Sequence, residues 1–243
     1  MQTQSTSTAI AAAVHLEWVQ NLAQALSEQG LLLRGGFTPT SADELPPLLD
    51  GRTAGTLLMV GNAGAEMWRA FSASPEATDG QAHPLNRWTR RQTDTIALAA
   101  GGVALYPFDA IPAWPFQRWA ARAEPVTPTP LGLLIHPRFG LWHAYRAAIL
   151  VAPEVHFPAP EPGAGPCASC TDRPCLTTCP VAAFSASGYD VPACAQHLAA
   201  PEGQDCLGNG CVARRACPVG KDFAQAPAQN AFHMQAFFRA VEP

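Results

Sequence analysis

All eight cysteines of this 243-residue chain lie between Cys167 and Cys217. The first four follow the pattern C-x2-C-x4-C-x3-C-P, which runs from Cys167 to Cys179. A lone Cys194 comes next, and the last three follow the pattern C-x4-C-x5-C-P, with Cys217 as the final cysteine. Two [4Fe–4S] clusters require eight thiolates, four for each cluster. The cysteines therefore predict iron–sulfur chemistry, which is one-electron transfer.

The order of the cysteines also predicts how they are shared between two clusters. In two-cluster ferredoxins, the fourth cysteine of such a run binds the other cluster. The ligands expected for cluster one are Cys167, Cys170, Cys175 and Cys217. The ligands expected for cluster two are Cys179, Cys194, Cys206 and Cys211. The x4 gap and the isolated Cys194 depart from the usual ferredoxin spacing, but the number of ligands is intact.

Two other uses of clustered cysteines are open. The same eight thiolates would suffice for two four-cysteine zinc sites, which usually contain paired C-x2-C knuckles. The chain has a single C-x2-C, and both cysteine runs end in Cys-Pro, which favours iron–sulfur clusters over zinc. Disulfides are the remaining alternative, and they are rare in a reducing compartment.

Composition indicates a folded protein with no affinity for nucleic acid or membranes. Apolar residues make up 48% of the chain, and the net charge of −4 provides no basic surface for nucleic acid. No apolar run reaches the roughly 18 residues of a membrane span. The N-terminus has no basic segment of the kind that begins a signal peptide. We therefore expect a cytoplasmic protein.

The pattern of apolar residues predicts a mixture of helices and strands. Spacing of four predicts a first helix over Thr8–Gln29 that ends at Gly30. Further helices are expected over Pro84–Ala100 and Phe223–Val241. Strands are expected over Leu31–Leu33, Thr56–Val60, Gly102–Phe108, Leu131–Ile135 and Ala147–Val151. The segment Gly61–Gly64 is expected to form a turn.

A proline-rich stretch separates the cysteines from the rest of the chain. Residues 152–166 contain five prolines, a composition typical of an extended, semi-rigid linker. We expect an α+β domain over residues 1–152, a linker over 153–166 and the cysteine domain over 167–222. Residues 223–243 should form a C-terminal helix that packs on the body.

The segment before the linker resembles known cobalamin proteins. Ile135–Gly140, Trp142, Ala144 and Arg146 match the I-H-P-R-F-G-x-W-x-A-x-R stretch of CblC-type trafficking proteins, which decyanate and dealkylate cobalamins. The region is also similar to the G-W-x-G-K-N stretch of epoxyqueuosine reductases and corrinoid reductive dehalogenases. Those reductases carry C-x2-C-x2-C-x3-C-P, a lone Cys and C-x2-C-x3-C-P, which this cysteine block parallels with insertions. The chain thus resembles the iron–sulfur, cobalamin-dependent reductase superfamily.

This resemblance implies a fold, cofactors and partners. The fold would be α+β, with a flavin-reductase-like (nitroreductase-like) α/β N-terminal domain followed by a ferredoxin-like domain with two [4Fe–4S] clusters. The N-terminal domain would bind cobalamin or, as a second choice, flavin. A redox partner protein would donate electrons, and a corrinoid or another small molecule would accept them.

The resemblance also indicates site residues outside the cysteines. Asp109 lies in a D-x-x-P setting like that of the proton donor in epoxyqueuosine reductases, although it is also a residue that favours turns. His136, Arg138 and Arg146 are candidates for cofactor binding, since arginine offers a planar fork of donors. Alternatively, His136 satisfies backbone groups of a turn while the two arginines form salt bridges.

Two hypotheses about function follow. The first is an iron–sulfur oxidoreductase that passes electrons to a corrinoid cofactor or to its substrate. The second is a non-enzymatic, ferredoxin-like electron carrier, whose degenerate cofactor domain docks a partner. A zinc-stabilised interaction module is a third hypothesis. The substrate, the electron donor and the cluster potentials are not encoded in these patterns.

Overall fold

The computed structural model describes residues 17–161, 163–185 and 188–241, and shows a mixed α+β structure. Its contacts divide the chain into two compact units. The first contains the residues up to Asn62, Glu66–Glu124 and Ala144–Pro160; the second contains Ala63–Ala65, Pro125–His143 and the chain from Glu161 onward. The segment Pro125–His143 thus groups with the cysteines, although it precedes the proline-rich stretch. The boundaries expected at residues 152 and 167 stay a prediction.

The first unit is built on an open sheet. Within the described residues this sheet has four strands in the order β1-β2-β6-β3. The strands are β1 (Leu32–Phe37), β2 (Thr56–Ala63), β3 (Val103–Leu105) and β6 (His143–Val151). β1 pairs antiparallel with β2, and β3 pairs antiparallel with β6. β2 is buried along its whole length, as expected of an interior strand covered on both faces.

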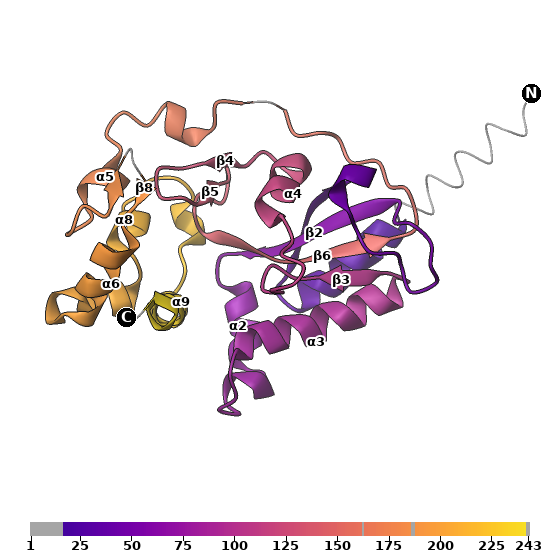
Figure 1. Ribbon diagram of the computed structural model, residues 1–243, viewed down its shortest axis with the longest axis horizontal. Coiled ribbons are helices and arrows are strands. Elements are labelled where there is room, and N and C mark those ends of the chain that lie inside the picture. Colours follow the sequence, from indigo (N-terminus) through magenta and orange to yellow (C-terminus); the bar gives the residue numbers. More distant parts are fainter. Residues whose placement is uncertain (1–16, 162, 186–187, 242–243) are drawn as a thin grey trace, which may run out of the picture. The chain divides into compact units, whose positions relative to one another are not determined.

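Helices pack against this sheet. They cover residues 17–28, Glu66–Ser72 (α2), Pro84–Ala99 (α3) and Phe116–Ala123 (α4). α3 contacts β3, while α4 contacts β1 (Figure 1). α3 begins with Pro84, whose fixed φ suits a first helical position, and it buries Trp88 together with one side of the helix. None of the helices in the described part of the chain combines the length and apolar character needed to cross a bilayer.

The first helix ends where the sequence predicts. Gly30 has a φ of +68°, and the N–H of Leu31 donates to the carbonyl of Leu26 at 3.0 Å. This is a Schellman-type ending, for which glycine is favoured because it enters the left-handed region without strain. A Cβ at Gly30 would also lie 2.5 Å from the backbone of Glu66, so the position admits no side chain. The predicted residues 8–16 of this helix lie outside the described residues.

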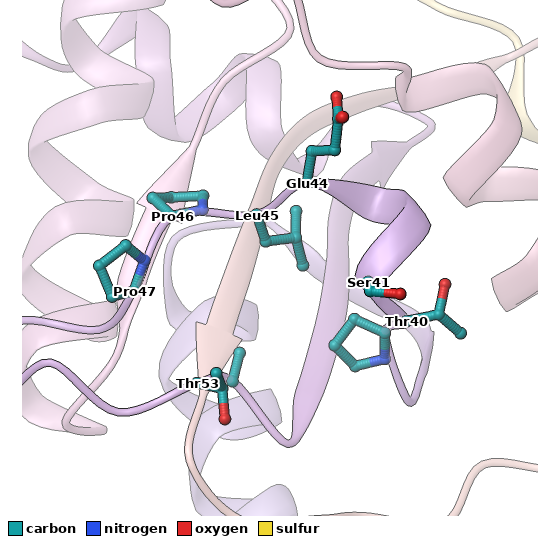
Figure 2. Close-up of a pocket in the computed structure, with 9 residues that line it drawn as sticks. Thr40, Ser41, Glu44, Leu45, Pro46, Pro47 and Thr53 are labelled. Carbon is teal, nitrogen blue, oxygen red and sulfur yellow. The ribbon is translucent and has the colours of Figure 1, made fainter.

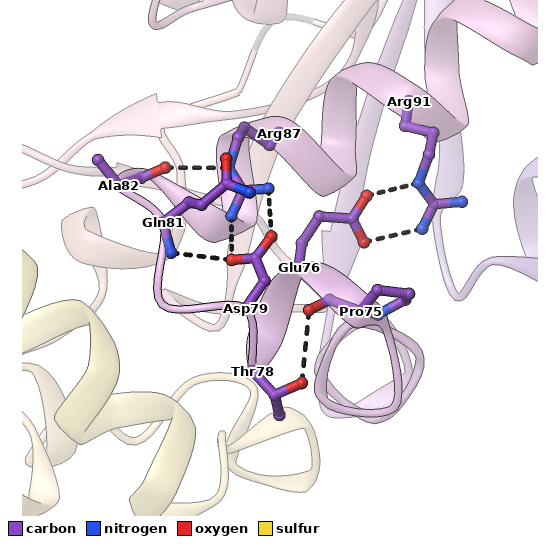
Figure 3. Close-up of polar contacts among 8 residues, drawn as sticks. All are labelled: Pro75, Glu76, Thr78, Asp79, Gln81, Ala82, Arg87 and Arg91. Carbon is purple, nitrogen blue, oxygen red and sulfur yellow. Dashed lines mark hydrogen bonds and ion pairs between the residues drawn. The ribbon is translucent and has the colours of Figure 1, made fainter.

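Two arginines attach the start of α3 to the preceding loop (Figure 3). Arg87 makes a two-pronged contact with Asp79, at 2.8 and 2.7 Å. Arg91 contacts both carboxylate oxygens of Glu76, which lies in the short 3₁₀ helix Pro75–Ala77. Such bidentate pairs fix orientation as well as supplying energy.

The second unit consists of short elements. Its helices are α5 (Pro174–Thr177), α6 (Val191–Ala199), α7 (Gln204–Asn209), α8 (Val212–Arg215) and α9 (Pro227–Val241). Its strands are β4 (Thr127–Pro128), β5 (Leu134–Ile135), β7 (Phe184–Ser185) and β8 (Gly188–Tyr189). β4 pairs with β5, and β7 pairs with β8, both antiparallel. α9 packs on α7 and α6.

Several expected elements have different bounds. The segment Gly61–Gly64 is not a turn as a whole, because β2 continues through Ala63. β3 ends at Leu105 rather than at residue 108, and Pro107 beyond it has no N–H for a sheet ladder. The predicted strand at residues 131–135 is reduced to β5. α9 begins at Pro227, because Lys221–Phe223 forms a separate 3₁₀ helix.

Candidate functional site

In the second unit, several cysteines lie close enough to affect one another's pKa. Burial raises the pKa of Cys167, and the nearby thiols of Cys217, Cys175 and Cys170 raise it further. Burial likewise raises the pKa of Cys175, with Cys217 and Cys170 as its neighbours. Arg173 opposes these effects on Cys167. Cys217 therefore lies with the first three cysteines, although it is the last in sequence.

The other four cysteines form a second group. Burial raises the pKa of Cys194, and the thiols of Cys179 and Cys206 add to the effect. Burial also raises the pKa of Cys211, and the thiols of Cys206 and Cys194 raise it further. A hydrogen bond from the hydroxyl of Tyr189 acts in the opposite direction on Cys194. Cys194 and Cys211 therefore have Cys206 as a common neighbour, and which cysteines bind which cluster stays a prediction.

Short helices and backbone amides position these sulfurs. Cys211 is the N-cap residue of α8, where the backbone N–H groups of Arg214 and Ala213 oppose the rise that burial causes in its pKa. The N–H of Ala183 donates to the sulfur of Cys179 at 3.4 Å. N–H groups directed at sulfur favour the thiolate over the thiol, and the thiolate is the form that binds metal.

Five of the eight cysteines lie in or against an apolar core. Leu131, Ile135, Leu141, Ala213 and Cys217 are buried together. The half-buried residues packed against them are Cys167, Cys175, Cys179, Phe184, Cys211 and Val219. A dry, apolar surrounding is one of the factors that set the reduction potential of an iron–sulfur centre.

All eight cysteines lie in the described part of the chain, and none of them forms a disulfide. Among the described residues, no three His, Cys, Asp or Glu side chains come together in the arrangement of a single-ion metal site.

The turn after β5 belongs to this cysteine unit. A Cβ at Gly140 would lie 1.9 Å from the carbonyl oxygen of Val219, and a Cβ at Gly220 would lie 2.3 Å from the backbone of Phe139. Both positions have positive φ. The two glycines therefore allow the matched Ile135–Gly140 motif to pack directly on the backbone that follows Cys217.

His136 has a structural task in this turn. Its Nδ1 accepts hydrogen bonds from the N–H groups of Arg138, at 3.0 Å, and Phe139, at 3.2 Å. Its backbone also exchanges two hydrogen bonds with Gly140. An accepting Nδ1 places the ring proton on Nε2 in the neutral imidazole. The structure therefore shows His136 satisfying backbone groups of the turn.

Arg138 lies over two aromatic rings instead of in a salt bridge. Its guanidinium carbon is 5.5 Å from the ring centre of Phe139 and 5.5 Å from that of Phe223. The two rings meet edge to face, 4.9 Å apart. Arg138 is exposed, so its donors face solvent above this aromatic pair.

Arg146 lies in the first unit, on β6. Its Nε donates to Oδ1 of Asn62 at 3.2 Å, and burial lowers its pKa to about 10. Among the described residues, no carboxylate forms an ion pair with it or shifts its pKa. One of the two roles expected for Arg146 was a salt bridge. Among the described residues, Arg146 is instead hydrogen-bonded to Asn62.

Asp109 lies in the loop after β3, also in the first unit. Its carboxylate forms an ion pair with Arg90 at 2.6 Å, and both side chains are partly exposed. Arg90 in turn lies over the rings of Tyr106, at 4.1 Å, and Phe108, at 5.4 Å. The neighbouring Ile111 is 94% exposed, so the loop carries an apolar side chain at its surface.

The loop between β1 and β2 forms a pocket that the sequence did not indicate (Figure 2). Its volume is near 440 Å³. It is lined by Pro39, Thr40, Ser41, Glu44, Leu45, Pro46, Pro47, Thr53 and Ala54. None of the predicted site residues is among them.

Three residues near the candidate site were missed by sequence reasoning. Tyr189 faces Cys194 and stacks on Phe184, with ring centres 4.7 Å apart. Arg214 donates to the carbonyl of Leu141 at 2.7 Å. Asn62 contacts Arg146, but it was assigned to a turn. The position of Arg214 between the last two cysteines was the only available signal.

Comparison with known proteins gives a structural likeness. No model of a protein family and no curated protein sequence matches the chain. A crystal structure of epoxyqueuosine reductase with an epoxyqueuosine-modified tRNA stem loop matches with a TM-score of 0.53 and 16% identity, over 87% of this chain and 68% of that one. The Bacillus subtilis enzyme, with its catalytic aspartate loop swung out of the active site, matches with a TM-score of 0.53 and 15% identity, over 86% and 66%.

A selenomethionine-labelled epoxyqueuosine reductase also matches, with a TM-score of 0.50 and 14% identity over 91% of this chain and 69% of that one. The chain therefore spans about two thirds of the length of these proteins. The likeness shows that the fold resembles that of epoxyqueuosine reductase over most of the chain.

Proposed function

We propose that this protein is an iron–sulfur oxidoreductase that carries two [4Fe–4S] clusters and passes electrons to a corrinoid cofactor or its substrate. The observation that carries the proposal is a set of eight free cysteines within one unit of a fold that resembles epoxyqueuosine reductase. The cysteine unit would be the ferredoxin-like part of the molecule.

The donor set fits this assignment. Cluster one would be held by Cys167, Cys170, Cys175 and Cys217, and cluster two by Cys179, Cys194, Cys206 and Cys211. Four thiolates per group match the ligand count of a cubane, which supplies one-electron transfer when bound. The apolar wall around Cys217 and the N–H groups that face Cys179 and Cys211 would keep water out and stabilise thiolates.

Residues of the matched motif are proposed as corrinoid-binding residues, each within its own unit. Arg146 has donors available for an amide or anionic group of a cofactor, since only its Nε is hydrogen-bonded. Arg138 presents its guanidinium above the Phe139–Phe223 pair, where it would contact a ligand face. His136 is a third candidate, and its Nδ1 already accepts hydrogen bonds from the turn. Flavin is the second choice of cofactor.

Asp109 would supply the proton that a reductive step requires. A carboxylate must be protonated before it can donate, so this role requires the ion pair with Arg90 to open. A precedent for loop movement exists in the Bacillus subtilis enzyme, whose catalytic aspartate loop is found swung out. In this chain, the exposed Ile111 lies on the same loop.

The alternative is an electron carrier without catalytic activity. Two contacts favour the electron carrier. Asp109 forms an ion pair with Arg90, and Nδ1 of His136 accepts a hydrogen bond from the backbone of its turn. Under this hypothesis the first unit docks a redox partner, and no corrinoid binds.

Titration with cob(II)alamin separates these functions. Protein purified without oxygen should contain about eight irons per chain and show the broad visible absorbance of iron–sulfur clusters. Binding of cob(II)alamin at micromolar concentration should change its absorbance and EPR spectra. An iron-loaded protein that alters neither the corrinoid nor the flavin spectrum would support the carrier. A colourless, zinc-loaded protein would exclude both.

A further inference from the structure

Arg146 is a cation whose hydrogen-bonding capacity is mostly unused. Its Nε donates to Asn62, while neither Nη nitrogen makes a hydrogen bond to any residue that the structure describes. The side chain is half-buried, so it is accessible from outside the unit. A guanidinium carries five N–H donors in a planar fork. Four of these five are therefore available to a ligand.

Glu124 is a carboxylate of the first unit, but it already forms an ion pair with another arginine. Glu124 pairs with the buried Arg34, at 2.7 and 3.1 Å, and accepts a hydrogen bond from the hydroxyl of Tyr145. Tyr145 and Arg146 are consecutive residues of β6, so their side chains lie on opposite faces of the sheet. Glu124 neutralises Arg34 on one face, while on the other face no carboxylate of the described residues forms an ion pair with Arg146.

Asn62 adds a second donor that lacks a partner. The residue is fully buried, and its Nδ2 makes no hydrogen bond to the described part of the chain. The amide orientation is fixed by its neighbour, because Oδ1 must be the atom that accepts from Arg146. A buried donor without a partner destabilises the protein, and so does a desolvated cation without a counter-charge. One ligand group would satisfy both.

We propose that Arg146 and Asn62 form a binding site for an oxyanion, a carboxylate or phosphate group carried by a ligand. Charge-assisted, bidentate contacts from arginine are the usual means of recognising such groups. The inference deepens the proposed function, because FMN and cobalamin both contain a phosphate group. The identity of the ligand rests on the proposed function, whereas the anion contacts themselves involve only residues of the first unit.

The first test uses small anions. The full-length protein is titrated with inorganic phosphate and with acetate at constant ionic strength, by calorimetry. Arg146→Gln removes the fork, and Asn62→Asp keeps Arg146 but gives it an internal carboxylate. We expect both variants to bind about tenfold more weakly or worse. Arg146→Lys, which keeps the charge without the fork, should fall in between.

Arg69→Gln is the matched control, because Arg69 is exposed on α2 and pairs only locally with Glu66. It should bind like the wild type. The circular dichroism spectrum of every variant establishes that it is folded. The proposal is overturned if folded wild type binds neither anion, or if Asn62→Asp and Arg146→Gln bind as tightly as the control.

The second test identifies the source of the anion. FMN is compared with riboflavin, and cobalamin with cobinamide, which lacks the nucleotide phosphate. A preference for the phosphate-bearing member that disappears in Arg146→Gln assigns the site to that cofactor. Equal binding within both pairs, with small-anion binding intact, assigns it to a substrate group. Failure of all four ligands with retained phosphate binding would refute the corrinoid proposal and leave the anion site standing.

Discussion

Crossed ligation by the eight cysteines can be tested with paired substitutions. The structure places Cys217 near Cys167, and both Cys179 and Cys211 near Tyr189. Cys167→Ala with Cys217→Ala should therefore remove two ligands from one group and leave the other group complete. About four of about eight irons should remain. Cys179→Ala with Cys211→Ala should give the same count from the opposite cluster.

A third pair of substitutions should damage both clusters instead of one. Cys167→Ala with Cys179→Ala takes one ligand from each group, so neither group keeps four thiolates and iron should fall below four per chain. The assay is iron and sulfide analysis of anaerobically reconstituted protein, with spin counting by EPR after reduction. The first two pairs should show one spin per chain from an undisturbed cluster.

Linear ligation, with the first four cysteines on one cluster, predicts the opposite pattern. It assigns Cys167 and Cys179 to one cluster, so that their removal would leave about four irons. It also predicts that the pair Cys167 and Cys217 damages both clusters. Observation of this pattern would refute the grouping of Cys217 with the first three cysteines.

Three further predictions concern the first unit. Glu124→Gln leaves Arg34 as an uncompensated buried charge and should lower the free energy of unfolding by about 3–5 kcal/mol in urea titrations, whereas a change near zero would contradict the buried pair. The hydrogen bond from Arg91 lowers the pKa of Glu76 from 4.5 to about 2, so the stability that this pair adds is complete above pH 4.5 and is lost as pH falls toward about 2. Urea titrations should show wild type more stable than Glu76→Gln at pH 7 and equal to it at the acid end; a constant difference would show that the pair is not responsible. Asp109→Asn breaks only a partly exposed ion pair, so its unfolding free energy should change by less than about 1 kcal/mol, and a larger loss would mean that Asp109 is structural.

Much of the fold followed from local patterns in the sequence. The helix that ends at Gly30 and the helix that begins at Pro84 have strong local signals, and both are present. The interior strand β2 was visible as an apolar run from Thr56 onward. Its end was misjudged because Gly61 and Asn62 are typical turn residues, and only the pairing with β1 and β6 extends the strand through them.

Contacts between residues far apart in the sequence could not be predicted from local patterns. Arg34 and Glu124 are 90 residues apart, and neither has a local feature that indicates an ion pair. The segment Pro125–His143 belongs with the cysteines because Leu131, Ile135 and Leu141 complete their apolar core, which no local periodicity reveals. The two turn glycines needed for that packing are far apart in the sequence.

The candidate site was predicted unevenly. Cysteine spacing indicated two sets of four ligands, and this division stays a prediction. Motif matching selected His136 and Arg146 but could not say that the turn uses Nδ1 of His136 or that Asn62 is the neighbour of Arg146. Those contacts depend on which strands pair, and hence on the fold as a whole.

Electron delivery to a corrinoid is the central claim, and one anaerobic experiment tests it directly. Fully loaded protein is reduced, freed of reductant and mixed with cob(II)alamin, and the EPR spectrum is followed. The cob(II)alamin signal should disappear as the protein is reoxidised, and Cys179→Ala with Cys211→Ala should slow or abolish this loss. A reduced protein that keeps its electrons beside unchanged cob(II)alamin would contradict the account.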